Sequence, residues 1–307
     1  MPDVIEAAIL GVVQGLTEFL PISSTGHLVI VEEALGISQD EFGLRFDAAI
    51  HLGTLAAVIV YFRATWAALL LGWLQSLRLR DWQATPDSRL AWLLLLATIP
   101  AGLTGLAIES TADAAFRSPA LVAFMLIVFC LPLIAAEWSV GKRSAGDGVG
   151  RAGRSPSDQS AGREGSRPSL AQSGRDTASA TPVDAIILGL AQSVALIPGV
   201  SRSGITISAG MLRGFRREEA AAFTFLLSAP IIAAAGGKQI FDIARGEPGG
   251  SVHYGVYAVG LITAGLVGYA AIAFLLRYLR TNTLYAFVAY RIVLGVTVLS
   301  LVGAGAL

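Results

Sequence analysis

The chain has 307 residues, of which 54% are hydrophobic and 14% are charged, and its mean hydropathy is +0.65. Soluble domains carry roughly 25% charged residues, so these values exclude an ordinary water-soluble protein. The 22 Lys and Arg residues balance the 22 Asp and Glu residues. We therefore expect no nucleic-acid partner, because no net positive charge attracts the chain to a polyanion.

The first apolar segment is too short and too interrupted to cross a bilayer as one helix. Val4–Phe19 runs into a Pro-Ile-Ser-Ser-Thr-Gly break, and a second short stretch, His27–Leu35, follows it. A spanning helix needs about 20 mostly apolar residues. Non-helical backbone at membrane depth is tolerated only where it is buried in protein or lines an aqueous cavity. The pattern therefore predicts a re-entrant helical hairpin.

Six later segments are long and apolar enough to span the membrane. They are Phe46–Phe62, Leu90–Ile108, Pro119–Ala136, Ala220–Gly237, Tyr254–Leu276 and Leu284 to the C-terminus. In lipid, a helix satisfies its own backbone hydrogen bonds, whereas an isolated strand cannot. We expect an all-α polytopic membrane protein.

The charges of the connections predict how the spans are oriented. Connections rich in Lys and Arg tend to stay in the cytoplasm. Residues 63–89, residues 141–182 and the pair Arg277 and Arg280 are basic, whereas residues 109–118 are acidic on balance. Both termini are therefore expected on the periplasmic or exterior side of the membrane. Residues 141–182 are also dense in Gly, Ser and Pro, which predicts a disordered cytoplasmic linker.

This linker separates two halves that begin alike. AAILGVVQGLTEFLPISSTG (7–26) resembles AIILGLAQSVALIPGVSRSG (185–204), given one inserted residue in the second copy. The matching pairs are Gly11 and Gly189, Gln14 and Gln192, Pro21 and Pro198, Ser23 and Ser201, and Gly26 and Gly204. Three spans follow each opening, and an odd number inverts the second copy. We predict an inverted-topology repeat with a first half at 1–140 and a second at 183–307.

The second opening predicts another re-entrant hairpin. Val183–Ile197 runs into the break Pro198-Gly-Val-Ser-Arg-Ser-Gly, and Ile205–Leu212 returns to a basic cluster. Because the halves are inverted, the two hairpins enter from opposite faces. Their tips should meet near mid-membrane and enclose a polar site.

The two tips carry side chains suited to phosphate chemistry. The first supplies Gln14 and Glu18, one helical turn apart, and then Ser23, Ser24, Thr25, Gly26 and His27. The second supplies Ser201, Arg202, Ser203 and Gly204. Guanidinium groups and helix N-termini both bind phosphate. Glu18 could hold a divalent cation with Gln14 as a neutral second ligand, or it could act as a base.

Structural roles are the alternative for several of these residues. Glu18 could simply pair with Arg202, and the Ser-Ser-Thr-Gly sequence is a common helix N-cap. His51 is expected to serve helix packing. For Arg291 we expect a structural role, either reaching toward the interface or pairing with Asp184 or Glu6.

QGLTEFLPISSTGHL (14–28) and PGVSRSGITIS (198–208) resemble the two signature motifs of the undecaprenyl-diphosphate phosphatase family, also called bacitracin-resistance proteins. The resemblance implies removal of the terminal phosphate of undecaprenyl diphosphate, which recycles the lipid carrier for peptidoglycan synthesis. It also implies a Mg or Ca cofactor, an inverted-repeat membrane fold, and a bacterial inner-membrane site facing the periplasm. The family's functional positions fall on Glu18, Ser24, His27 and Arg202. Gln14 departs from the fully acidic form of the first motif.

Several alternatives stay open at this point. Either Ser24, activated by Glu18 or His27, or His27 itself is the nucleophile. Inverted repeats with broken helices also build secondary carriers, so the chain could move a phosphorylated lipid across the bilayer, alone or as a secondary role. A structural partner of cell-wall enzymes is a third possibility. A prenyl diphosphate and membrane lipid are the expected partners, and a homodimer is one expected assembly.

Overall fold

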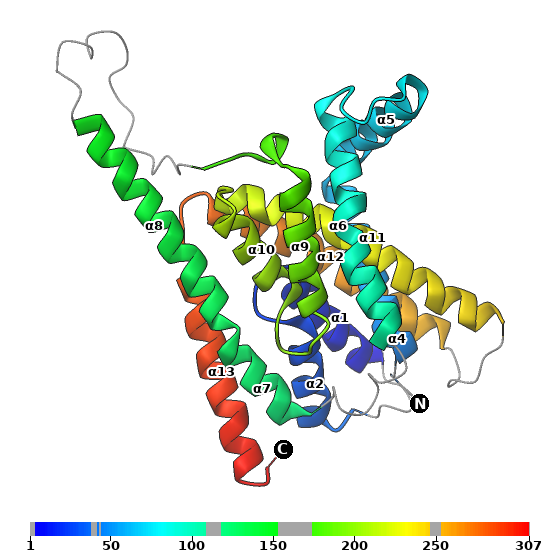
Figure 1. Cartoon of the computed structure of the whole chain (residues 1–307). Coiled ribbons are helices and arrows are strands. Elements are labelled where there is room, and N and C mark those ends of the chain that lie inside the picture. Colours follow the sequence, from blue (N-terminus) through cyan, green and yellow to red (C-terminus); the bar gives the residue numbers. More distant parts are fainter. Residues whose placement is uncertain are drawn as a thin grey trace, which may run out of the picture.

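The computed structural model describes residues 4–37, 42, 44–108, 118–152, 174–245 and 253–306. Helices are the regular elements of these ranges (Figure 1). They are α1 (Val4–Phe19), α2 (Ser24–Leu35), α4 (Leu44–Tyr61), α5 (Arg63–Leu79), α6 (Pro86–Ile108), α7 (Pro119–Val128), α8 (Cys130–Ala152), the short η4 (Thr177–Ser179), α9 (Pro182–Val194), α10 (Arg202–Leu212), α11 (Arg217–Ala244), α12 (Tyr254–Leu279) and α13 (Tyr285–Gly303).

Five segments of the described chain are helical, long and apolar enough to cross a membrane. They are Pro86–Ala107, Pro119–Arg143, Arg217–Gln239, Tyr254–Leu279 and Tyr285–Gly303. A sixth exists if the pair Phe46–Tyr61 and Arg63–Leu79, bent by 80° at Phe62, counts as one span. These segments overlap the six predicted spans, and the prediction of an all-α multi-pass membrane protein is confirmed.

The helical hairpins α1–α2 and α9–α10 approach each other from opposite ends of the molecule (Figure 1). Neither hairpin packs mainly on its own half of the chain. Helix α1 lies along α12, whereas α9 lies along α6. At Gly11 an added Cβ would lie 2.5 Å from the carbonyl oxygen of Gly260, and at Gly189 it would lie 2.4 Å from that of Ala97. Two matching glycines thus permit the same close helix contact in both halves.

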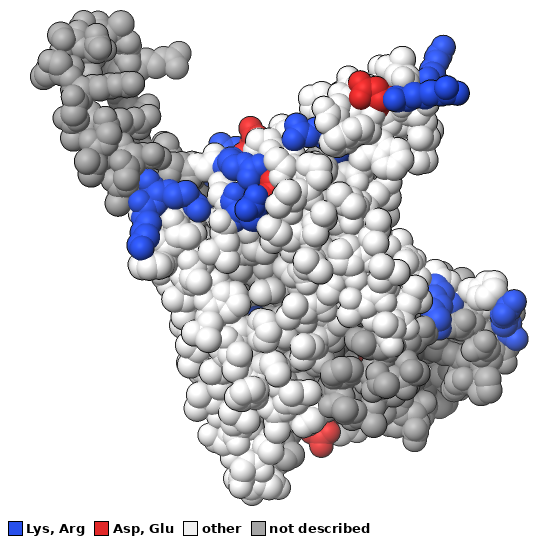
Figure 2. All heavy atoms as spheres, in the orientation of Figure 1, with Lys and Arg blue, Asp and Glu red and all other residues white. Residues whose placement is uncertain are grey.

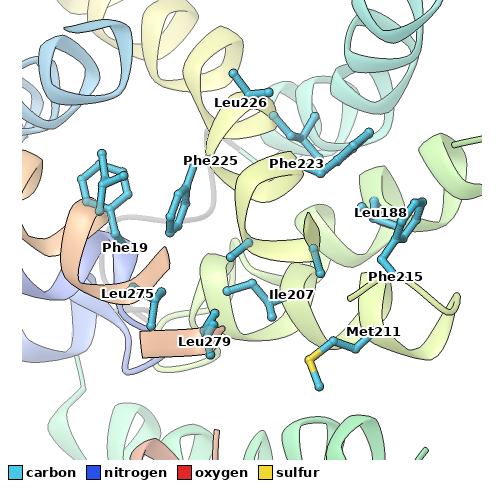
Figure 3. Packing of buried hydrophobic residues seen from close by; sticks show 14 of the residues in the cluster. Phe19, Leu188, Ile207, Met211, Phe215, Phe223, Phe225, Leu226, Leu275 and Leu279 are labelled. Carbon is cyan, nitrogen blue, oxygen red and sulfur yellow. The ribbon is translucent and has the colours of Figure 1, made fainter. Parts of the chain in front are cut away.

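A continuous hydrophobic core joins the two halves behind the hairpin tips. Phe19 of α1 meets Phe225 of α11 edge to face, with ring centroids 5.2 Å apart. Figure 3 shows side chains from α9, α10, α11 and α12 converging in the same region, among them Ile207 and Leu275. These residues are buried within the protein, so the tips rest on a packed scaffold rather than on lipid.

The surface separates apolar and charged regions as a membrane protein requires. In Figure 2 the broad middle of the visible face is almost entirely white, and Lys and Arg side chains gather at the end where α5, α8 and α10 reach the surface. A smaller basic group lies at the far end of α11. The basic connections at residues 63–89 and 141–182 therefore lie at one end of the molecule, as predicted, and the group on α11 lies outside that pattern.

The structure differs from the predicted linker at both of its ends. Helix α8 continues through residues 141–152, and residues 174–182 are ordered by contacts with the second hairpin. Residues 153–173 lie outside the described residues. The physical reason for the order after residue 173 is a buried carboxylate, that of Asp184, which the composition of the segment does not reveal.

Asp184 fixes the start of the second hairpin. Its side chain is paired with Arg175 (Nη2 to Oδ2, 2.8 Å) and with Arg213 (Nε to Oδ1, 2.7 Å). It also forms a reciprocal capping box with Thr181. Burial alone raises the pKa of a carboxyl group, but the hydrogen bonds from Arg175, Thr181 and Arg213 outweigh burial, and the pKa of Asp184 lies well below its ordinary value. The group therefore stays ionised, and its contribution to stability is lost only in strong acid.

Candidate active site

The two hairpin tips share one backbone design. Ser23 and Ser201, at matching positions, have φ values of 75° and 76° and are the N-caps of α2 and α10. Their hydroxyl oxygens accept hydrogen bonds from the N–H groups of Gly26 (3.4 Å) and Gly204 (3.1 Å). A positive φ in a non-glycine residue is strained and persists only where the surroundings enforce it. Both tips therefore have a fixed backbone conformation that the surrounding structure enforces.

The tips also contact each other directly. The Ser203 hydroxyl donates to the carbonyl oxygen of Leu20 in the first tip at 2.8 Å and lies 3.2 Å from the Ser201 hydroxyl. The hydroxyls of Ser23, Ser201 and Ser203, together with the N–H groups of Gly26 and Gly204, are thus used in the framework. The structure gives these five residues a framework role, and Ser23 and Ser201 also line the pocket described below, so their phosphate contacts stay a prediction.

Arg291 of α13 binds both tips at once. It is fully buried, and its guanidinium donates, over 3.0 to 3.4 Å, to five backbone carbonyl oxygens: Pro21, Met125, Leu126, Gly199 and Val200. Planar guanidinium donors suit such a fan of acceptors. A structural role was expected for Arg291, and the structure gives it one of a different form. The predicted reach toward the interface is wrong because the side chain is fully buried, and the predicted pairing with Asp184 is wrong because Arg175 and Arg213 pair with that carboxylate.

A small polar pocket lies between the tips. Its walls combine residues of both hairpins: Glu18, Ser23, Ser24, Thr25, Ala195, Ile197, Pro198, Gly199, Ser201 and Arg202. The Ser24 hydroxyl donates to Glu18 Oε2 at 2.7 Å. Arg202 Nη1 lies 3.4 Å from Glu18 Oε1 and has no hydrogen-bond partner. Arg202 is therefore ion-paired with Glu18, as the structural alternative for Glu18 predicted, and its Nη1 still has a donor to offer to an anion in the pocket.

Two further side chains surround the Glu18 carboxylate. Gln14 Nε2 donates to Glu18 Oε2 at 3.1 Å, whereas Gln14 Oε1 is buried without a hydrogen-bond partner. His51 Nε2 lies 3.7 Å from Glu18 Oε2, and His51 Nδ1 donates to the carbonyl oxygen of Asp47 at 2.6 Å. The sequence predicted only a packing role for His51, because nothing in α4 indicates that this helix faces the first tip.

His27 lies beside this pocket rather than in its lining. Its Nδ1 is 2.7 Å from the carbonyl oxygen of Ser23, and its Nε2 is 2.7 Å from the hydroxyl oxygen of Tyr290 on α13. Tyr290 was not predicted from the sequence. The signal that could have found it is the Tyr-Arg pair at 290–291, two polar side chains in the first third of a mostly apolar span.

The arrangement is suited to binding a phosphate and attacking it. Ser24 and Arg202 are the first residues of α2 and α10, so two helix N-termini open at the pocket, and the first N–H groups of a helix lack intrahelical partners. A hydroxyl hydrogen-bonded to a carboxylate is an activated nucleophile. Together these groups provide an anion site with a nucleophile at its edge.

Comparison with known proteins identifies the family. Residues 7–297 match the family model described as "Bacitracin resistance protein BacA". The chain belongs to the BacA family. The chain is 42% identical over 302 residues to an undecaprenyl-diphosphatase of Rubrobacter xylanophilus, a match that covers 98% of this chain and 99% of the relative. It is 41% identical over 299 residues to an undecaprenyl-diphosphatase of Thioalkalivibrio sulfidiphilus, which covers 97% and 99%.

The BacA match includes both hairpins and α13, which carries Tyr290 and Arg291. It therefore spans every element that contributes to the pocket. Within the described residues, no group of three or more His, Cys, Asp or Glu side chains is placed to hold a metal ion.

Proposed function

We propose that the chain is an undecaprenyl-diphosphatase. It hydrolyses the terminal phosphate of undecaprenyl diphosphate to give undecaprenyl phosphate and inorganic phosphate, which recycles the carrier for peptidoglycan synthesis and confers bacitracin resistance. The observation that carries this proposal is the Ser24 hydroxyl held 2.7 Å from Glu18, with Arg202 of the opposite hairpin beside the same carboxylate. The names of the relatives, at about 40% identity over nearly the whole chain, give the substrate class.

In the proposed reaction, Ser24 Oγ attacks the terminal phosphorus, and its proton passes to Glu18. The bond from that phosphorus to the bridging oxygen breaks, and undecaprenyl phosphate leaves with the bond electrons. Water then attacks the phosphoserine phosphorus and gives a proton to His27, and the bond from phosphorus to Ser24 Oγ breaks. Glu18 returns its proton to Ser24 Oγ, and inorganic phosphate leaves with the proton that His27 held. Arg202 and the N-termini of α2 and α10 stabilise the negative charge carried by the phosphoryl oxygens.

The geometry favours Ser24 over His27 as the nucleophile. Ser24 lines the pocket and already has a carboxylate that can accept its proton. The Nε2 atom of His27 instead has the Tyr290 hydroxyl as a partner at 2.7 Å. His27 would have to break this contact to attack phosphorus, whereas Ser24 would only have to transfer a proton along an existing hydrogen bond.

A divalent cation, Mg or Ca, fits the residues present if the substrate completes its coordination. Gln14 and Glu18 would hold it, since Gln14 Oε1 is a buried oxygen with no hydrogen-bond partner next to the Glu18 carboxylate. Magnesium is commonly bound by one or two carboxylates together with substrate phosphates. When bound, the cation supplies Lewis-acid neutralisation of phosphate charge.

Removal of divalent cations is expected to abolish phosphate release, and Gln14→Glu is expected to lower the half-saturating Mg concentration on the order of 10-fold. The second carboxylate adds a charged ligand where the neutral amide oxygen now lies. Phosphate release measured across a Mg titration after EDTA treatment checks both. Full activity in excess EDTA, or an unchanged Mg midpoint in Gln14→Glu, would contradict the assignment of these ligands.

We further propose that the pocket faces the periplasm or exterior of a bacterial cytoplasmic membrane. The second hairpin begins at the basic end of the molecule, and its tip points toward the other end (Figure 1). Basic ends tend to stay in the cytoplasm. A cysteine introduced at Thr111 should be labelled by an impermeant reagent from outside intact cells, and one at Ser160 should not. The native Cys130 is buried and gives little background, and the reverse labelling pattern would refute this orientation.

The function is tested by the products formed from undecaprenyl diphosphate. Purified protein in detergent should release one inorganic phosphate for each undecaprenyl phosphate that appears. A carrier alone would move labelled lipid between the leaflets of proteoliposomes and leave the diphosphate intact. Lipid movement without phosphate release would therefore replace the phosphatase by a carrier, and movement in addition to release would add the secondary flipping role.

A further inference from the structure

Tyr290 extends from α13 to the ring of His27 on α2, although the two residues are far apart in the sequence. The phenol oxygen lies 2.7 Å from His27 Nε2. The two rings are stacked, with centroids 5.6 Å apart and planes 7° from parallel. Tyr290 is held in place because its neighbour Arg291 is anchored by carbonyl oxygens of both tips. The contact is therefore part of the same framework that joins the hairpins.

The hydrogen bonds of His27 define its tautomer. Nδ1 lies 2.7 Å from the carbonyl oxygen of Ser23, and a carbonyl oxygen only accepts, so Nδ1 carries a hydrogen. In the neutral ring Nε2 then carries a lone pair, and the Tyr290 hydroxyl donates a hydrogen bond to it. If Nε2 becomes protonated, the same phenol oxygen can accept from it. One contact thus serves both protonation states of the ring.

We propose that Tyr290 is a positioning residue for His27. Its hydroxyl orients the ring and donates to the Nε2 lone pair of the tautomer that the Ser23 carbonyl selects, and it lets His27 take up and return a proton without turning. The effect on catalysis rests on the proposed phosphatase function, whereas the hydrogen bond to His27 Nε2 does not. Stacking of the two rings would also orient the imidazole. A test of the hydrogen bond must therefore remove the hydroxyl and keep the ring.

Tyr290→Phe keeps the stacked ring and removes only the hydroxyl. The matched control is Tyr285→Phe on the same helix, because Tyr285 is 47% exposed and Tyr290 is 44% exposed. Nitrogen-15 NMR of histidine-labelled protein in micelles reports the tautomer directly. The chain has three histidines, and the His27→Gln variant assigns the His27 signals. Kinetics of phosphate release from undecaprenyl diphosphate provide the second readout.

For Tyr290→Phe we expect a shifted His27 Nε2 resonance and a kcat reduced roughly 10-fold to 100-fold, with KM changed by less than about 2-fold. For Tyr285→Phe we expect neither change. An unchanged His27 spectrum in Tyr290→Phe, an effect on KM alone, or an equal loss in Tyr285→Phe would each overturn the proposal. If the wild type releases no phosphate, the proposed function fails, and the nitrogen spectrum still decides whether the Tyr290 hydroxyl binds His27 Nε2.

Discussion

Ser24→Ala is expected to lower kcat for phosphate release on the order of 1,000-fold or more, because loss of a nucleophile removes the covalent route. Ser24 is the N1 residue of α2, and the N-cap that holds the helix start is Ser23. The substitution should therefore leave the melting temperature within about 2 °C of the wild type. Phosphate release and thermal unfolding measured on the same detergent-purified sample separate catalysis from stability.

Thr25→Ala is the matched control for Ser24→Ala. Thr25 is the adjacent hydroxyl residue, lines the same pocket and is more exposed, but among the described residues no carboxylate forms a hydrogen bond with its hydroxyl. We expect Thr25→Ala to retain activity within about 10-fold of the wild type. If Ser24→Ala retains that much activity too, Ser24 is not the nucleophile. Acid-quenched protein that carries labelled phosphate on His27 rather than on Ser24 would then identify the alternative.

Arg291→Met is expected to impair both folding and activity more than any other substitution outside the pocket. The variant removes the Arg291 donors from five carbonyl oxygens. Those of Met125 and Leu126 in α7 keep other donors, whereas the tip carbonyls of Pro21, Gly199 and Val200 lose the guanidinium that joins the hairpins. An unsatisfied buried polar group costs about 1–3 kcal/mol, so we expect the free energy of unfolding to fall by at least about 3 kcal/mol. Thermal unfolding in detergent and phosphate release at a permissive low temperature measure the two effects.

Arg291→Lys gives a graded comparison, because an ammonium group offers three donors from one point instead of a planar fork. It should be intermediate in stability and still strongly impaired in phosphate release. Arg277→Met is the control for the loss of a cation from the membrane domain, since Arg277 is exposed at the end of α12. A melting temperature of Arg291→Met equal to that of Arg277→Met would contradict the role of Arg291 in joining the tips.

Local sequence was sufficient to predict the residues that build the pocket. Glu18, Ser24 and Arg202 lie within two short motifs whose breaks interrupt apolar runs, and each half repeats the break. Because both breaks occur at membrane depth, the meeting of the tips followed from topology. The structure brings these residues together in one pocket.

The contributions of distant helices could not be predicted in the same way. His51, Tyr290 and Arg291 reach the tips from α4 and α13, and their partners depend on how those helices rotate against the hairpins. The sequence also could not show that Gly26 and Gly204 donate their N–H groups to the serine caps. A serine hydroxyl and a bound phosphate are competing acceptors for these N–H groups. The backbone geometry at Ser23 and Ser201 decides which of the two accepts the hydrogen bond.

The packing of the hairpins against the opposite half was likewise not evident from the repeat. The matching glycines Gly11 and Gly189 indicated two equivalent helices but not what they touch. In the structure they contact α12 and α6, the middle spans of the other halves. The two halves therefore depend on each other for a complete site.

In the proposed reaction residues of both hairpins act together on a prenyl diphosphate, and Arg202→Ala removes the contribution of the second hairpin. The measurement is the rate of phosphate release from undecaprenyl diphosphate with Mg present, for the wild type, Arg202→Ala and the exposed control Arg78→Ala. We predict release by the wild type and by Arg78→Ala, and a loss of roughly 100-fold or more in Arg202→Ala without loss of fold. Wild-type protein that is folded and releases no phosphate, or Arg202→Ala that releases it at the wild-type rate, would contradict the account.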